Sequence, residues 1–197
     1  MKLSELAREV LGAKVKGGDA EIRGLCIDSR VAGKGDLFFC FRGTHTDSHV
    51  FAGEAERRGA SAVGAERELE VNLPQLLVPD GREAMSRVSA AFYGHPEKKL
   101  SFVGVTGTNG KTTVSQMLRN IFGEEGKRAG VIGTLGASYA SVEVSPSLTT
   151  PDPVFLFSLL ADMVQANTEI AVMEVSAHAL ALKKELPICY DIAVFTN

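Results

Sequence analysis

A glycine-rich turn in the middle of the chain constrains its fold more than any other feature. The short apolar run Phe102–Val105 leads into the turn Thr106–Gly110, and Lys111–Thr113 open a segment whose apolar residues recur at helical spacing. A strand, a glycine-rich loop and a helix in this order form a phosphate-binding loop, in which backbone N–H groups and the helix N-terminus surround phosphate oxygens. The sequence therefore predicts a site for a nucleoside triphosphate.

The residues of this loop have distinct expected roles. Gly107 and Gly110 let the backbone close around phosphate oxygens, Lys111 supplies a cation for the outer phosphates, and the Thr112 hydroxyl can bind Mg²⁺. The strict motif has a glycine six positions before the lysine, where this chain has Val105, so the loop is a variant. The alternative is a helix capped after a glycine-rich turn with a solvated lysine, and the strand context favours the triphosphate site.

Length and composition limit the class of protein. A chain of 197 residues with 45% hydrophobic content can form one large or two small domains with a real core. The net charge of −3 gives no support for binding nucleic acid or a membrane surface. No apolar run approaches the roughly 20 residues of a membrane span, and the acidic N-terminus is unlike a signal peptide. Three cysteines without a close pair fit free thiols, so we expect a cytoplasmic protein.

The first half of the chain alternates short helices and strands. The run Leu37–Phe41 is continuously apolar, which predicts a strand buried on both faces. The turn and charge cluster Gly94–Lys99 breaks the pattern. We therefore expect a small N-terminal α/β substrate domain over residues 1–97 and a second domain over 98–197.

The second half predicts a parallel sheet with helices on both faces. Strands alternate with helices, a pattern typical of such sheets. The expected strands are Phe102–Val105, Ala129–Ile132, Glu169–Val175 and Ile192–Phe195, and the expected helices are Val114–Phe122 and Val154–Val164. Ligand groups in these sheets follow the carboxyl ends of strands, and the chain stops at such an end at Asn197. We therefore expect a truncated domain from a longer protein.

Further polar residues follow the predicted strands. Glu174 ends a buried strand, and in a phosphate-loop protein such an acid can hold the Mg²⁺ on the terminal phosphates; the alternative is a solvated or capping carboxylate. Thr149 and Thr150 precede two prolines, which equally fits a helix N-cap. The loops Asp28–Arg30 and Gly43–Asp47 also follow strands, and their spacing does not distinguish a binding site from ordinary turns.

Several of these segments together resemble the Mur ligase family. The Thr106–Thr113 loop matches the ATP loop of that family, including the missing first glycine. Segments that resemble its uridine-diphosphate-binding domain are Asp28–Arg30, Gly35–Phe38 and Gly43–Phe51. Leu148–Pro153 and Glu174–Leu180 resemble in particular the family member that adds the third peptide residue in peptidoglycan synthesis. The resemblance covers essentially the whole chain.

The resemblance implies an ATP-dependent amide ligase. Such an enzyme adds an amino acid, diaminopimelate or L-lysine, to UDP-N-acetylmuramoyl-L-alanyl-D-glutamate through an acyl phosphate, and the resemblance suggests a monomer. It implies that Lys111 and Glu174 are catalytic and that Thr112 and Glu174 hold Mg²⁺. The residues implied to hold ATP are Gly107, Thr108, Asn109, Gly110, Lys111, Thr112 and Thr113. Those implied to hold the nucleotide-sugar substrate are Ser29, Thr44, His45, Thr46, Thr149, Thr150, Ser176 and Lys184.

The chain departs from the family pattern at three positions. Ala177 stands where the family usually has a second serine, and Leu182 stands where it has a glutamine. Lys184 replaces an arginine, so it keeps the charge but loses the planar fork. The family's carbamylated lysine and second metal-binding histidine would follow Asn197, together with a third domain. We therefore expect this chain alone to be inactive.

Two other functions remain open at this point. One is the neighbouring ligase that adds the D-alanyl-D-alanine dipeptide, for which we expect different residues in place of Leu148–Pro151 and Glu174–His178. The other is a module that binds nucleotides without catalysing a reaction. By resemblance, the choice between diaminopimelate and lysine is made largely by the third domain.

Overall fold

The computed structural model describes residues 1–43, 46–145 and 148–197. The chain forms two compact units, Met1–Phe92 and Tyr93–Asn197, each built around its own sheet. The boundary expected from the sequence, after residue 97, falls within the short helix η2 (Pro96–Lys98), inside the second unit. Both units are of the α/β class that the sequence predicts.

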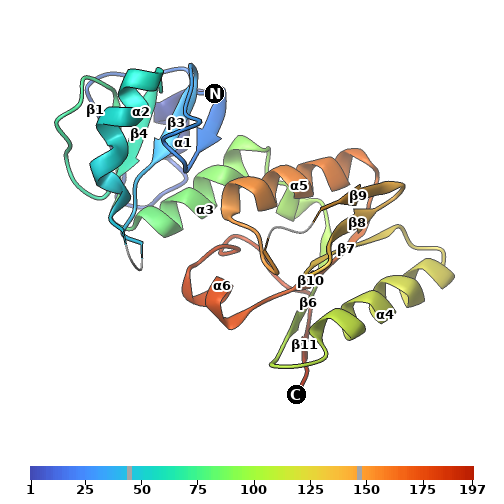
Figure 1. Ribbon diagram of the computed structural model, residues 1–197. Coiled ribbons are helices and arrows are strands. Elements are labelled where there is room, and N and C mark those ends of the chain that lie inside the picture. The colour runs from blue at the N-terminus through green and yellow to red at the C-terminus, as the bar shows by residue number, and fades with distance from the viewer. Residues whose placement is uncertain (44–45, 146–147) are drawn as a thin grey trace. The chain divides into compact units, whose positions relative to one another are not determined.

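The first unit contains a five-stranded sheet in the order β1-β5-β4-β3-β2. Strands β2 to β5 pair in parallel, whereas β1 lies antiparallel on β5. Its strands are β1 (Lys14–Lys16), β2 (Gly24–Cys26), β3 (Asp36–Phe39), β4 (Ala62–Ala65) and β5 (Gln75–Leu77). Its helices are α1 (Leu3–Ala7), η1 (Ser48–Phe51), α2 (Ala52–Arg58) and α3 (Gly81–Phe92) (Figure 1).

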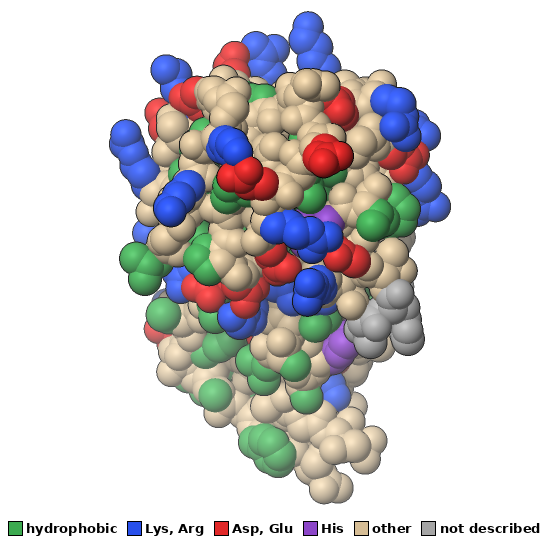
Figure 2. All heavy atoms as spheres, turned by 90° about the vertical axis from the view of Figure 1, so that its left-hand side faces the viewer, with side chains coloured by type: hydrophobic (Ala, Val, Ile, Leu, Met, Phe, Trp, Pro, Cys, Tyr) green, Lys and Arg blue, Asp and Glu red, His purple; other side chains and the backbone are tan. Residues whose placement is uncertain are grey.

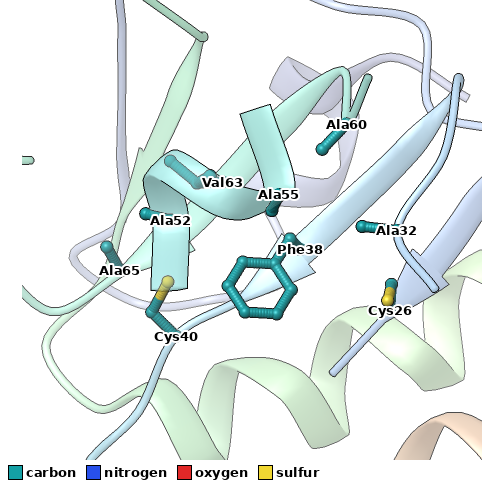
Figure 3. Close-up of a cluster of buried hydrophobic side chains, with 9 residues drawn as sticks. All are labelled: Cys26, Ala32, Phe38, Cys40, Ala52, Ala55, Ala60, Val63 and Ala65. Atoms are coloured by element: carbon teal, nitrogen blue, oxygen red, sulfur yellow. The ribbon is translucent and has the colours of Figure 1, made fainter. Parts of the chain in front are cut away.

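The core of this unit forms around β3. Leu37, Phe38 and Phe39 are 0%, 1% and 0% exposed, which confirms the predicted strand with two buried faces. Phe38 packs in a cluster with Ala52 and Ala55 of α2 (Figure 3). Alanine side chains are small, so the helix can approach the sheet closely and pack tightly on it.

The second unit contains a six-stranded sheet in the order β11-β6-β10-β7-β8-β9. Its strands are β6 (Ser101–Thr106), β7 (Ala129–Gly133), β8 (Gly136–Tyr139), β9 (Val142–Val144), β10 (Ile170–Glu174) and β11 (Ile192–Phe195). Its helices are η2 (Pro96–Lys98), α4 (Lys111–Glu124), α5 (Pro153–Gln165) and α6 (Ala177–Ala181). The four strands β11, β6, β10 and β7 pair in parallel, as the sequence predicts.

The antiparallel strands β8 and β9 were not predicted. They form a meander that extends the sheet beyond β7. Gly136, Ala137 and Ser138 in β8 have low strand propensity, and each strand is too short to show a hydrophobic period. The strands form because β7 offers a free edge for backbone pairing, which a local pattern does not reveal.

Helices cover both faces of the parallel strands. Figure 1 shows α4 on one side of the sheet and α5 on the other. Val114 and Leu118 of α4 pack on buried valines of the sheet, Val103, Val105 and Val172 among them. The fully buried side chains of α5 include Leu156, Phe157, Leu160 and Met163. This packing brings the carboxyl ends of β6, β7, β10 and β11 to one edge of the sheet.

No helix in the described parts of the chain is both long and apolar enough to cross a membrane. On the face seen in Figure 2, Lys and Arg side chains are interspersed with Asp and Glu side chains. Mixed charge of this kind gives no broad electrostatic attraction for a polyanion.

Candidate nucleotide and substrate sites

The loop after β6 has the backbone of a phosphate-binding loop. Gly107 and Gly110 have φ of 134° and 84°, which L side chains rarely adopt, and α4 begins at Lys111. A Cβ on Gly107 would also lie 2.4 Å from the carbonyl oxygen of Thr196 on β11's exit. Glycine is therefore required at Gly107 both for the turn and for the close approach of the neighbouring segment.

The loop amides already converge on one oxygen atom. The N–H groups of Thr108 and Asn109 donate to the carbonyl oxygen of Asn197 at 2.7 and 2.9 Å. Two neighbouring N–H groups that point at one acceptor form an arrangement that fits an oxyanion. Lys111 Nζ reaches back over the loop and donates to the carbonyl oxygens of Gly107 and Thr108 at 2.7 and 3.2 Å.

Glu174 lies beside the first turn of α4. Its side chain is buried at the end of β10, with a residue exposure of 1%. Thr112 Oγ1 donates to Glu174 Oε2 at 3.0 Å, so the predicted pair of metal ligands is brought together. Among the described residues no group of three or more His, Cys, Asp or Glu side chains could hold a metal. A hydroxyl, one carboxylate and phosphate oxygens are nevertheless the ligands that Mg²⁺ takes in nucleotide sites, so these residues fit Mg²⁺ with ATP.

Thr134 joins this site although sequence reasoning missed it. It lies in the turn after β7, and its backbone N–H and hydroxyl both donate to the Glu174 carboxylate, at 3.1 and 3.0 Å. The sequence did contain a feature that could have identified this residue, because Thr134 is the first polar residue after the predicted strand Ala129–Ile132. A polar residue at the carboxyl end of a buried strand is a candidate site residue when a neighbouring strand of the same sheet ends at a predicted ligand site.

The threonine pair before the prolines meets the end of β10. Thr149 Oγ1 lies 3.0 Å from Thr134 Oγ1. Thr150 is 2% exposed; its hydroxyl donates to the Glu174 carbonyl at 3.0 Å and accepts from the Ser176 N–H at 3.2 Å. Lys184 Nζ donates to the Thr150 carbonyl at 2.9 Å. The structure thus brings Thr149, Thr150, Ser176 and Lys184 together around Glu174.

Two of the polar side chains in this region also cap helices. Ser176 Oγ accepts the N–H of Ala179 and begins α6. Asp152 accepts the N–H of Phe155 at 3.1 Å, with Pro153 in the first turn of α5, which confirms the helix-cap interpretation for that end of the loop. Asp152 thus begins α5 directly after the threonine pair, and Ser176 begins α6 directly after β10.

The first unit places its candidate residues at the carboxyl edge of its own sheet. Ser29 follows β2, and Thr46 follows β3, which pairs with β2 in parallel. Ser29 is 6% exposed and donates its hydroxyl to Glu54 Oε2 at 2.7 Å. Thr46 is exposed, and its carbonyl accepts the N–H of Gly43 at 2.8 Å. The candidates Thr44 and His45 lie outside the described residues.

A buried histidine fixes the end of this loop. His49 Nδ1 lies 2.5 Å from Asp47 Oδ1, and His49 Nε2 accepts the N–H of Glu66 at 3.1 Å, which places the ring proton on Nδ1. The hydrogen bond from His49, with a smaller contribution from Arg67, holds the pKa of the Asp47 carboxyl far below its usual range. Asp47 is thus an ionised anchor at the N-terminus of η1. Sequence reasoning did not single out His49.

Family comparisons agree with this architecture. Residues 105–197 match the model of the Mur ligase middle domain, and residues 21–93 match the model of the catalytic domain of the Mur ligase family. Together the two matches cover most of the chain, and they divide it at nearly the same place as the two structural units. The chain belongs to the Mur ligase family.

Its curated relatives point to one branch of that family. The chain is 43% identical along its whole length to a UDP-N-acetylmuramoyl-L-alanyl-D-glutamate–2,6-diaminopimelate ligase of Geobacillus thermodenitrificans. It is 40% identical to the ligase of the same name from Bacillus velezensis. The chain spans about 40% of the length of these relatives.

Solved structures show the same arrangement. A structure of a UDP-N-acetylmuramoyl-L-alanyl-D-glutamate–2,6-diaminopimelate ligase superposes on 89% of this chain with a TM-score of 0.74 and 29% identity, using 36% of its own length. A MurF structure from Acinetobacter baumannii covers 88% of the chain and 35% of its own, with a TM-score of 0.61 and 24% identity. The second likeness shows the fold alone.

Proposed function

We propose that this chain is the nucleotide-sugar-binding and ATP-binding part of a ligase that adds diaminopimelate to UDP-N-acetylmuramoyl-L-alanyl-D-glutamate. The observation that carries the proposal is the hydrogen bond between Thr112 and Glu174 beside the phosphate loop, on whose carbonyls Lys111 folds, in a chain 43% identical to a ligase of that name. We place the protein in the cytoplasm as a monomer, where its nucleotide-sugar substrate and ATP are available.

The residues of the second unit hold the nucleotide. In this proposal the amides from Gly107 to Thr113 bind phosphate oxygens, while Lys111 turns from the loop carbonyls to the β- and γ-phosphates. Thr112 and Glu174 hold Mg²⁺. ATP with Mg²⁺ supplies the phosphoryl group that converts the substrate carboxylate into an acyl phosphate. The protein contributes positioning and charge neutralisation rather than covalent chemistry.

The loop around Thr149 positions the acceptor carboxylate. Thr149 presents its hydroxyl beside Thr134 and Glu174, on the side where the metal and γ-phosphate are proposed. Thr150 and Lys184 hold this loop against the end of β10. Ser176 begins α6 at the same strand end. We propose that these residues orient the muramoyl-dipeptide so that its D-glutamate carboxylate faces the γ-phosphate.

The first unit is proposed to bind the uridine diphosphate. Ser29 and Thr46 lie at the carboxyl edge of its sheet, with Thr44 and His45 in the same segment of the sequence. The buried His49 and the ionised Asp47 hold the end of this segment in place.

The similar proteins favour diaminopimelate over the other two incoming groups, D-alanyl-D-alanine and lysine. The solved structures that would support a D-alanyl-D-alanine ligase are less than 25% identical to this chain. They therefore support the shared fold and not that activity. Diaminopimelate, rather than lysine, is the amino acid in the names of the relatives at 39–43% identity. The proposal therefore takes diaminopimelate as the incoming amino acid.

The proposal is tested by amino-acid-dependent phosphate release. The chain is extended at its C-terminus to the length of the curated relatives and supplied with ATP, Mg²⁺ and UDP-N-acetylmuramoyl-dipeptide. We expect phosphate release with diaminopimelate, little with lysine and none with D-alanyl-D-alanine. Glu174→Gln should abolish it, whereas the matched surface change Glu125→Gln should not. Release with D-alanyl-D-alanine alone, or release that needs no amino acid, would overturn the proposal.

A further inference from the structure

The turn after β7 holds the Glu174 carboxylate on both of its oxygens. Oε1 accepts the Thr134 N–H at 3.1 Å, and Oε2 accepts the Thr134 and Thr112 hydroxyls, each at 3.0 Å. Two of these three donors belong to Thr134. Thr134 thus helps to orient the Glu174 carboxylate beside α4, although Thr134 lies on neither the phosphate loop nor β10.

Gly133 leaves the space that this arrangement needs. A Cβ at Gly133 would lie 2.1 Å from Glu174 Oε1 and 2.7 Å from its Cγ, and the three nearest atoms all belong to Glu174. The backbone of Gly133 is outside the positive-φ region, so an alanine fits the backbone. A side chain at this position would therefore displace the Glu174 carboxylate rather than strain the strand.

The Thr134 hydroxyl also joins the two halves of the site. It lies 3.0 Å from Thr149 Oγ1 as well as 3.0 Å from Glu174 Oε2. A hydroxyl has one proton, so if Thr134 donates to the carboxylate, it accepts from Thr149. Thr149, Thr134 and Glu174 then form a chain of hydrogen bonds from the proposed substrate loop to the proposed metal ligand.

We infer that Thr134, in the space left by Gly133, is a positioning residue that aims the Glu174 carboxylate at the metal beside the phosphate loop. The inference rests on the proposed Mg²⁺–ATP site, and Thr134 acts in it through Glu174. Thr134 is exposed in its turn, so its hydroxyl is not part of the core. Valine has nearly the same shape and keeps the backbone hydrogen bond, so Thr134→Val removes the hydroxyl alone.

The test is calorimetric titration of the 197-residue chain with ATP, once with Mg²⁺ and once with a chelator. We expect Thr134→Val to reduce the Mg²⁺-dependent gain in affinity about three- to tenfold, the effect of one or two hydrogen bonds. Affinity without Mg²⁺ should not change. Thr134→Ser should restore the gain, and Gly133→Ala should reduce it. Ser141→Ala, in the exposed β8–β9 turn, is the matched control, and thermal unfolding checks each fold.

The outcomes distinguish a failure of this inference from a failure of the proposed function. An unchanged Mg²⁺ dependence in Thr134→Val would overturn the positioning role. Equal loss of ATP affinity with and without Mg²⁺ would also overturn it, because it would show a structural effect on the loop. If the wild-type chain gains nothing from Mg²⁺ and Glu174→Gln changes nothing, the proposed metal site itself fails and the inference fails with it.

Discussion

The segment after α6 contains a buried carboxyl group without a hydrogen-bond partner among the described residues. Glu185 is 4% exposed, and neither of its carboxylate oxygens accepts a hydrogen bond from the described residues. Burial raises the pKa of Glu185, and the nearby charge of Lys184 offsets this only in part. A raised pKa means that folding favours the protonated form. Its contribution to stability is therefore complete below the unfolded-state pKa and is lost as the pH rises through the folded-state pKa.

Replacing this side chain should change how stability depends on pH. We expect Glu185→Gln to raise the free energy of unfolding by about 1–3 kcal/mol at pH near 8, because it removes a buried uncompensated charge. Near pH 4 the difference should largely vanish, since the native carboxyl is then protonated. Urea denaturation at the two pH values measures this, with the exposed Glu125→Gln as control. The same gain at both pH values would contradict the assigned cause.

At the scale of elements, β6 depends on a close contact with the segment that leads into β11. A Cβ at Gly104 would lie 2.8 Å from the ring of Tyr190, so the ring covers the glycine directly. The same ring meets Phe102 edge to face, with centroids 6.3 Å apart. The Tyr190 hydroxyl is buried without a hydrogen-bond partner among the described residues. The packing of the ring, and not its hydroxyl, therefore holds this segment.

Two substitutions separate the contribution of the Tyr190 ring to stability from that of its hydroxyl. Gly104→Val should destabilise the chain by about 1–3 kcal/mol, because the added side chain forces the ring away from β6. Tyr190→Phe keeps the ring and removes an unpaired polar atom, so stability should stay the same or rise. Chemical denaturation of both variants provides the measurement. A marked loss of stability in Tyr190→Phe would show that the hydroxyl is paired after all.

The sequence predicts those elements whose pattern is local. The buried run in β3, the buried strands β6, β7 and β10, and the edge strand β11 carry enough apolar residues to be recognised. The β8–β9 meander was missed because it depends on the free edge of β7. Thr134 and His49 were missed for a similar reason: each acts through a partner distant in sequence, Glu174 in one case and the Glu66 N–H in the other.

At the scale of the whole molecule, the two units follow one principle. Each has a mainly parallel sheet and carries its candidate ligand residues at the carboxyl edge of that sheet. Ser29 and Thr46 follow strands of the first unit, and the phosphate loop and Glu174 follow strands of the second. This placement could be predicted from motif and alternation. The hydrogen bonds among the residues at each edge could not be predicted, because they depend on side-chain geometry that only the fold supplies.

The central claim is that the loop before α4 binds the phosphates of ATP, with Lys111 on the outer ones. Titration of this chain with Mg²⁺–ATP and with AMP, before and after Lys111→Ala, tests it most directly, and Lys127→Ala, beyond the end of α4, is the matched control. We expect Lys111→Ala to weaken ATP at least about tenfold while AMP affinity barely changes, because AMP lacks the phosphates that the lysine contacts. Equal loss for both nucleotides, or no loss for either, would contradict the account.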